Sequence, residues 1–332
     1  MRCNFASYKN KGIKMNNLFN EMLKQASKDY AKSSAIAYFD GDQVTIENSE
    51  NKLSITKNSS KGTIKLNNLK LFKLSDIDAD LTVRGNKLEL IDAIQPEREN
   101  SSFNGPSQHF PACFFDAKWL KVVGKNDVRY YLNGLNVKRE NNNVEIAGSD
   151  GHQLTFNNSL KETGDDYNLI VPRDAITLLT KVKDSIVMTL SDDKLRAKFQ
   201  GDNWTLETRL IDSKYPDFIK IFSQGVIATI EVNRKDMIQT LKEVKPFLNP
   251  KIQGVVLSVT TGNLHFEHEG KQLGSMRAGV INGGARLAFN AVYLIAALEC
   301  YTFEKIELAF MDNAIQLNKL GPQTNIIMSM RL

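Results

Sequence analysis

The 332-residue sequence contains few cysteines, no paired cysteines at metal-binding spacing and no long apolar run. Cys3, Cys113 and Cys300 are far apart and odd in number, which argues against a disulfide framework or a zinc site and favours reduced cytoplasmic thiols. Residues 1–14 are polar and basic and lack the apolar stretch of a signal peptide. No apolar segment approaches the roughly 20 residues that span a bilayer. We therefore expect a cytoplasmic protein without a membrane partner.

The motifs of common enzymes are also missing. The sequence contains no GxSxG, GxxxxGKS or HExxH motif and no Cys/His cluster. Asp150 and His152 are near neighbours, but we place them on a strand whose successive side chains point to opposite faces, so they are not expected to act on one substrate. The carboxylates at 165–166 and 192–193 are too few for the alternative of a metal-dependent nuclease. We expect no enzyme, no cofactor and no metal.

The composition that remains is that of a globular protein with a mild positive charge. Hydrophobic residues make up 42% of the chain, charged residues 24%, and the net charge is +5. A charge of this size permits contact with nucleic acid but is also common in proteins that do not bind it.

A repeated pattern organises the chain. The segments 62–92, 168–199 and 285–319 each predict a short strand, a short amphipathic helix and two strands joined by a tight polar loop. In the second segment Ile176, Leu179 and Val182 follow helical spacing, and alternating strands flank the residues at 192–193. Coincidence is the alternative explanation, but three evenly spaced occurrences favour a repeat.

A further helix and a hairpin precede each of these segments, so each repeat contains two helices and antiparallel strands over roughly 110 residues, a common domain size. The order predicts an α+β fold. We expect three domains: 1–108, which is divergent and shortened, 109–222 and 223–332.

Several short motifs resemble those of one known family. They are DVRYYLNG (127–134), SDGHQL (149–154), VPR (171–173), YPDF (215–218), FN (289–290) and MSMRL (328–332). In this order they resemble the bacterial DNA polymerase III beta subunit, the beta sliding clamp. The resemblance covers about 110–332, and the first third shares only the repeat pattern.

The resemblance implies three DNA-clamp domains and a head-to-tail homodimer that closes a ring around double-stranded DNA. Such a processivity factor is a non-catalytic subunit in DNA replication, and it binds DNA polymerase and clamp-loader subunits through short peptides. The divergent first domain motivates an alternative: a clamp-derived regulator that binds partner peptides or a host clamp without encircling DNA.

Cationic side chains on the predicted helices suit a lining that attracts phosphates without reading bases. A solvated helix face is the alternative for each of them, and the last helix, 290–301, contributes none. The candidates are Lys24, Lys28, Lys70, Lys73, Lys118, Lys121, Arg173, Lys181, Lys183, Arg234, Lys235 and Lys242. The resemblance adds Arg129, Tyr130 and Tyr131 near DNA at the rim of the hole, where packing within a strand is the alternative.

The resemblance also implies a groove for partner peptides and a dimer interface at Pro246 and Phe247. The implied groove residues are Leu132, Ser149, Gly151, His152, Gln153, Leu154, Pro216, Lys220, Ile221, Tyr293, Ile326, Met328, Ser329, Met330, Arg331 and Leu332. Without the family, Met328 and Met330 would be alternate core residues of one strand. Gln153 and Lys220 stand where the family often has arginine, and Ser329 replaces a proline. Lysine lacks the planar fork of arginine, so peptide affinity or choice is expected to differ.

Overall fold

The computed structural model describes residues 21–22, 36–39, 43–47, 51–56, 62–65, 102–112, 114–218, 225–318 and 321–332. The chain forms two compact units. The first comprises residues 1–120, 137–142 and 162–213, and the second comprises 121–136, 143–161 and 214–332.

The first unit contains an eight-stranded sheet with the order β4-β1-β2-β3-β12-β11-β10-β5. Every neighbouring pair is antiparallel. Between β3 and β12, Leu53 lies opposite Leu206, and both side chains are fully buried. Strands from two of the predicted repeats therefore form one sheet. The strands are β1 (Ile36–Phe39), β2 (Gln43–Glu47), β3 (Asn51–Thr56), β4 (Gly62–Lys65), β5 (Ser107–Phe110), β10 (Ile186–Leu190), β11 (Arg196–Gln200) and β12 (Trp204–Arg209).

Helix α3 (Arg173–Leu179) follows strand β9 (Tyr167–Pro172) directly, and it packs through the apolar stripe that the sequence predicts. Ile176 and Leu179 are fully buried. Helix α2 (Ala117–Val122) begins after Asp116, whose carboxylate accepts the Lys118 N–H at 2.8 Å.

The second unit contains two antiparallel sheets. The larger has the order β17-β13-β19-β20-β21-β8-β7, continued by β6 (Gly134–Glu140), and the smaller has the order β16-β15-β14-β18. The remaining strands are β7 (Asn143–Ser149), β8 (Gln153–Lys161), β13 (Val226–Asn233), β14 (Gly254–Thr260), β15 (Asn263–His268), β16 (Lys271–Arg277), β17 (Gly279–Gly283), β18 (Arg286–Asn290), β19 (Lys305–Met311), β20 (Ala314–Leu317) and β21 (Gln323–Met328).

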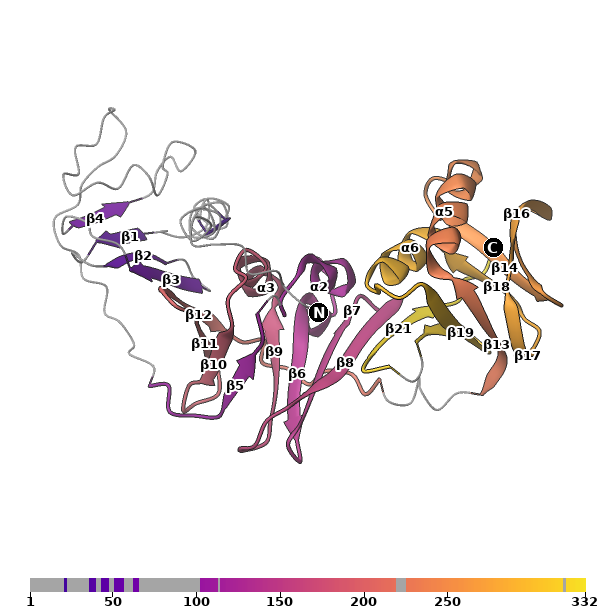
Figure 1. Ribbon diagram of the computed structural model, residues 1–332. Coiled ribbons are helices and arrows are strands. Elements are labelled where there is room, and N and C mark those ends of the chain that lie inside the picture. Colours follow the sequence, from indigo (N-terminus) through magenta and orange to yellow (C-terminus); the bar gives the residue numbers. More distant parts are fainter. Residues whose placement is uncertain are drawn as a thin grey trace, which may run out of the picture. The chain divides into compact units, whose positions relative to one another are not determined.

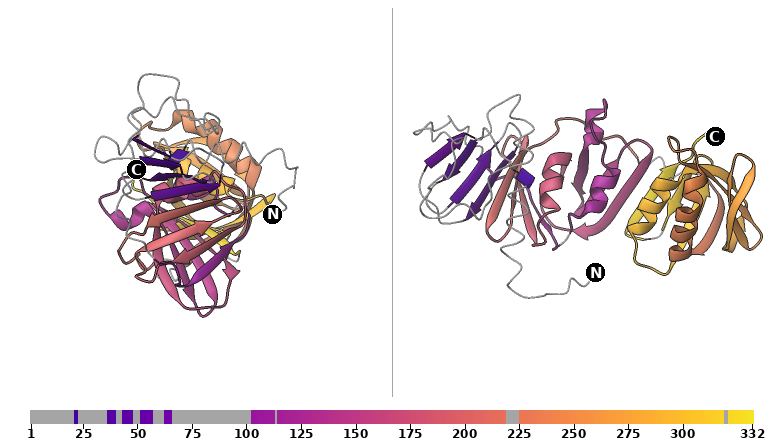
Figure 2. Two further views of the ribbon diagram at one scale, coloured as in Figure 1. Left: turned by 90° about the vertical axis from the view of Figure 1, so that its left-hand side faces the viewer. Right: turned by 90° about the horizontal axis from the view of Figure 1, so that it is seen from above.

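Helices α5 (Arg234–Val244) and α6 (Ala291–Glu299) lie side by side over this core (Figures 1 and 2). Both begin at an asparagine whose side chain accepts two backbone N–H groups of the first turn, which satisfies donors that a helix start leaves unpaired. Leu241 of α5 and Leu294 of α6 are fully buried within one apolar cluster with strand residues. The amphipathic spacing of α5 thus determines the face it buries, whereas α6 is apolar along most of its length.

The predicted strand–helix–strand–strand order is confirmed twice, as β9-α3-β10-β11 and as β18-α6-β19-β20. Of the first occurrence, only β4 lies within the described residues. The sequence pattern predicts a strand over residues 130–137, and its start is wrong. Residues 130–133 form the 3-10 helix η4 (Tyr130–Asn133), and the strand starts at Gly134. The Leu132 N–H donates to the Arg129 carbonyl at 2.8 Å, and the Asn133 side chain accepts the Asp127 N–H, so local bonds favour a turn here. The three-domain division stays a prediction.

Arg139 of β6 is a buried cation held by backbone carbonyls of the first unit. Its guanidinium donates to the Asp165 carbonyl at 2.6 and 2.9 Å and to the Ser107 carbonyl at 2.8 Å, and it lies 4.9 Å from the ring centroid of Tyr167. Only 2% of the residue is exposed. Because its hydrogen-bond donors are used, Arg139 fixes the loop at 164–166 to the start of β5.

We expect Arg139→Ala to lower the free energy of unfolding by about 3 kcal/mol, because two carbonyls lose their donors and a cation–π contact is removed. Urea denaturation of the full chain measures the change. Arg209→Ala, on the exposed side of β12, is the matched control and should change stability by less than about 0.5 kcal/mol. Equal effects of the two substitutions would contradict this role for Arg139.

Candidate functional site

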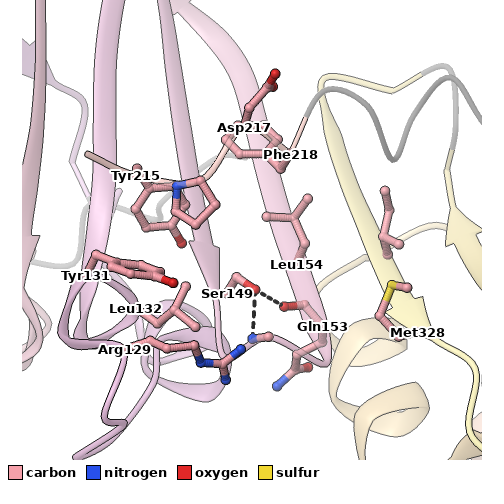
Figure 3. A pocket seen from close by; sticks show the side chains of 13 residues that line it. Arg129, Tyr131, Leu132, Ser149, Gln153, Leu154, Tyr215, Asp217, Phe218 and Met328 are labelled. Carbon is pink, nitrogen blue, oxygen red and sulfur yellow. Dashed lines mark hydrogen bonds between the residues drawn. The ribbon is translucent and has the colours of Figure 1, made fainter. Parts of the chain in front are cut away.

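The second unit contains a pocket of about 340 Å³ (Figure 3). This volume lies within the range of small-ligand sites. Its lining comes from residues 129–132, the β7–β8 turn, the segment at 215–218 and strand β21. The lining residues are Arg129, Tyr131, Leu132, Ser149, Gly151, Gln153, Leu154, Tyr215, Pro216, Asp217, Phe218, Ile326 and Met328.

Strand pairing builds the apolar part of the pocket. β8 and β21 are antiparallel, and Leu154 lies directly opposite Ile326. Cross-strand partners of this kind present their side chains on the same face. The segment at 215–218 lies over this face: the Phe218 ring is 5.5 Å from that of Phe156, two residues beyond Leu154. Tyr215 is buried, which raises the pKa of its hydroxyl, while the backbone of Ser149 lowers that pKa in part.

A tight turn between β7 and β8 forms the polar edge. Ser149 Oγ donates to the Gln153 carbonyl at 2.7 Å and accepts the Gly151 N–H at 3.0 Å. Asp150 accepts the N–H groups of His152 and Gln153. Gly151 has φ +87°, a conformation that favours glycine. Asp150 and His152 therefore lie in a turn rather than on the strand we expected.

Arg129 lies at this edge and forms a bidentate ion pair with Asp127. Its Nε and one terminal nitrogen donate to the Asp127 carboxylate at 3.0 and 2.8 Å, and the same terminal nitrogen donates to the Asp150 carbonyl at 3.1 Å. The hydrogen bonds from the Arg129 side chain and backbone lower the pKa of Asp127 to about 2. A Cβ at Gly151 would lie 2.5 Å from the guanidinium, so the glycine permits this close approach.

Gln153 and Tyr293 connect the pocket edge to helices of the same unit. The Gln153 amide donates to the Lys121 carbonyl and to Asp150, both at 2.9 Å. Both donors of the amide are thus used inside the protein. Burial raises the pKa of Tyr293, and the charge of Asp150 and a hydrogen bond with it add to the rise.

The predicted groove residues divide into three groups. The pocket brings together Leu132, Ser149, Gly151, Gln153, Leu154, Pro216, Ile326 and Met328. It is not lined by His152, Tyr293, Ser329, Met330, Arg331 or Leu332. Lys220 and Ile221 lie outside the described residues.

The C-terminal residues turn away after Met328. The Met330 N–H donates to the Ala288 carbonyl of β18 at 2.9 Å, and Leu332 packs over Gly254 of β14. Met328 and Met330 therefore do not share one strand face, because β21 ends between them.

Five lining residues were not in the predicted groove. Tyr215, Asp217 and Phe218 belong to the YPDF motif. They line the pocket only because the segment that carries this motif lies over β8. Arg129 and Tyr131 were assigned to a DNA rim, and here they line the pocket. Tyr130, between them, is 57% exposed.

The candidate DNA-contacting cations differ in burial and in their hydrogen-bond and ion-pair partners. In the first unit, Arg173 donates to the Leu120 carbonyl at 2.7 Å, and burial lowers its pKa. Lys118 pairs with Asp116, Lys181 lies 3.6 Å from Glu21, and Lys183 is half-buried. Lys24, Lys28, Lys70 and Lys73 lie outside the described residues.

In the second unit, Arg234 donates to the carbonyl of Leu298 at the end of α6 and to that of Phe303 in the segment that follows the helix. Lys235 is exposed in the first turn of α5. Lys121 and Lys242 both pair with Glu299, at 3.1 and 3.4 Å. Arg173 and Arg234 thus satisfy carbonyls at helix ends, whereas the lysines remain near solvent.

Pro246 and Phe247 lie in the 3-10 helix η5 (Lys245–Phe247), which follows α5. Phe247 is 69% exposed. In the part of the chain that the structure describes, no cluster of three or more His, Cys, Asp or Glu residues could hold a metal. No helix of the described residues is long and apolar enough to cross a membrane.

Solved structures define the class of fold. DNA polymerase III beta subunits from Thermotoga maritima and Pseudomonas aeruginosa align with TM-scores of 0.78 and 0.76, at 15% and 17% identity, and the alignments cover 96% of this chain and 98% of each structure. The sliding clamp of Bacillus subtilis aligns with a TM-score of 0.76 at 16% identity, with the same coverage of both chains. The fold is therefore that of DNA polymerase sliding clamps.

Sequence comparisons show similarity to the same class of protein. The family "DNA polymerase III beta subunit, central domain" matches residues 121–217. The beta sliding clamp of Pseudomonas putida is 25% identical over 225 residues, which cover 64% of this chain and 61% of the relative, and that of Rickettsia bellii is 26% identical over 243 residues, which cover 67% and 62%. The matched region thus spans about three fifths of these relatives. The chain is thus a distant relative of the beta sliding clamps, which are non-catalytic polymerase subunits.

We expect Gly151→Ala to raise the pKa of Asp127 from about 2 towards its ordinary 3.8, because the added methyl group displaces the Arg129 guanidinium. The pair contributes to stability above the ordinary pKa of Asp127 and is lost as pH falls through about 2 in the wild type. NMR titration of the aspartate carboxyl carbons measures the shift. Gly270→Ala is the control, because Gly270 has φ +75° but no atom near its Cβ position. An unchanged Asp127 pKa in the Gly151 variant would contradict the proposed contact.

Proposed function

We propose that the chain is a DNA sliding clamp that confers processivity on a replicative DNA polymerase by encircling double-stranded DNA. The observation that carries the proposal is the pocket in the second unit, whose lining contains groove residues inferred from motifs far apart in the sequence. The remaining support comes from the cations near solvent and from the exposed residues after α5.

The pocket has the chemistry that a short partner peptide requires. Leu154, Ile326 and Met328 offer an apolar surface for leucine and phenylalanine anchors. Methionine adapts to side chains of different shape, which suits a site that serves polymerase and clamp-loader subunits in turn. Asp217 and Arg129 add one charge of each sign at the pocket, and these would orient the peptide backbone or its polar side chains.

The lysines near solvent suit contact with DNA that slides. Lys121, Lys235 and Lys242 are all exposed, and none is a deeply buried structural cation. A flexible ammonium group can follow the phosphate backbone without contacting base edges, so binding would be independent of sequence and sensitive to salt.

Ring closure requires a second copy of the chain, and exposed apolar residues support a surface for it. Phe247 stands 69% exposed, Leu332 57% and Ile252 45%. Leu332 packs over Gly254, two residues after Ile252, so the C-terminus lies beside the start of β14. We propose that Pro246 and Phe247 belong to the interface of a head-to-tail homodimer.

A topological clamp should stay on a nicked circular plasmid after incubation with a bacterial clamp loader and ATP, and it should be lost when the circle is linearised. Phe247→Lys should abolish this retention and raise the dimer Kd more than about 100-fold, because an unpaired charge in an interface costs about 3 kcal/mol or more. Gel filtration of the loaded plasmid and light scattering of the free protein measure the two effects.

Phe303→Lys is the matched control, since Phe303 is 48% exposed but lies in the segment between α6 and β19. It should remain dimeric and be retained on the circle. Binding of partner peptides without any retention on circular DNA would instead support a clamp-derived regulator that does not encircle DNA.

We expect Met328→Ala to weaken binding of a synthetic peptide with Leu and Phe anchors roughly tenfold, because the pocket loses part of its apolar surface. Fluorescence anisotropy with a labelled peptide measures the Kd. Leu195→Ala is the control: Leu195 is 49% exposed and belongs to the first unit. The assignment of the pocket is wrong if both variants bind the peptide as tightly as the wild type.

A further inference from the structure

Glu299 joins two cations that come from different parts of the second unit. Its carboxylate lies 3.1 Å from Lys121 Nζ and 3.4 Å from Lys242 Nζ, with one oxygen directed to each lysine. Lys121 belongs to α2, Lys242 to the last turn of α5, and Glu299 to the end of α6. The pairing lowers the pKa of Glu299, so the carboxylate is ionised at neutral pH.

We propose that Glu299 occupies the position of a DNA phosphate between Lys121 and Lys242 and thereby lowers the affinity of the clamp for DNA. The inference rests on the proposed DNA-encircling function and adds a residue that regulates it. A carboxylate and a phosphate each offer anionic oxygens that two ammonium groups can share. While Glu299 is present, a phosphate that approaches these lysines must displace it.

The exposure of the three side chains makes such an exchange feasible. Lys121 is 46% exposed, Lys242 53% and Glu299 39%, so solvent and a DNA backbone can reach them. Ion pairs at this exposure stabilise a fold only weakly, so the protein loses little folding stability when the carboxylate is displaced. A buried pair would instead resist the exchange.

The position of Glu299 within α6 strengthens the inference. Glu299 is the last residue of α6, and the other residues of that helix, AVYLIAAL, carry no charge. Its charge therefore has no cation within its own helix to pair with, and it acts on lysines that other elements supply. Two of the cations that the sequence predicts to contact DNA are thereby partly neutralised by one acidic residue.

The test compares Glu299→Gln with the wild type in binding to a fluorescently labelled linear duplex over a series of salt concentrations. The variant should bind more tightly at low salt, and the slope of log K against log salt should steepen by about 1 to 2, since each additional phosphate contact contributes about 0.9. A role of Glu299 in the fold alone would not change this slope. Equal melting temperatures of the two proteins would show that the fold is retained.

Glu243→Gln is the matched control, because Glu243 is exposed on α5 and its carboxylate accepts a hydrogen bond from Gln239 at 2.7 Å. It removes the same charge from the same unit and should leave the salt slope unchanged. A second comparison places Glu299→Gln in a chain that also carries Lys121→Ala and Lys242→Ala, where the gain in affinity should disappear.

The outcomes separate the inference from the proposed function. If the wild type is retained on circular DNA but Glu299→Gln behaves like Glu243→Gln, the role of Glu299 is overturned and the clamp function stands. The same conclusion follows if the gain persists without the two lysines. If neither the wild type nor Glu299→Gln shows salt-dependent DNA binding, both proposals fall.

Discussion

The antiparallel pairing of β8 with β21 is the interaction on which the candidate pocket depends. It joins residues 153–157 to residues 323–327, which are separated by most of the C-terminal half of the chain. Leu154 and Ile326 become cross-strand neighbours only through this pairing, and the segment at 215–218 then has an apolar face to cover. The buried Asn325–Thr155 hydrogen bond, at 2.5 Å, lies in the same pairing and favours one register over the others.

Hydrogen bonds and one ion pair hold the polar edge of the pocket in place. Arg129 donates to Asp127 and to the Asp150 carbonyl, and the two amide donors of Gln153 bond the Lys121 carbonyl and Asp150. Because these groups already have partners, a ligand meets an edge of fixed geometry rather than flexible side chains. Such an arrangement lowers the conformational entropy that the protein loses on binding. This suits short peptides, which themselves lose much conformational freedom when they bind.

The cations of the candidate DNA surface serve two purposes. Arg173 and Arg234 satisfy helix-end carbonyls, so their charge is tied to the fold, whereas Lys121 and Lys242 share one exposed carboxylate. A sliding protein needs contacts that form and break easily, and weak exposed pairs meet that need better than buried ones. The same physical property that makes these pairs poor stabilisers of the fold makes them suitable for exchange with phosphates.

The sequence by itself determined the local elements and their order. The apolar spacing of α3, α5 and α6, the asparagines before α5 and α6, and the alternating strands around 192–193 all depend on interactions between residues close in the chain. The ordered motifs also indicated the similarity to sliding clamps, and eight of the groove residues predicted from that similarity line the pocket.

Only the tertiary structure decided which side chains meet. The direction of Arg129 depends on Asp127 and on the missing side chain at Gly151, and the path of Met330 depends on a bridge to β18. Glu299 of α6 pairs with Lys121 of α2 and Lys242 of α5, which are helices far apart in the sequence. Periodicity carries no information about such contacts, because they arise from the packing of segments whose relative position is set by the strand register and the buried core.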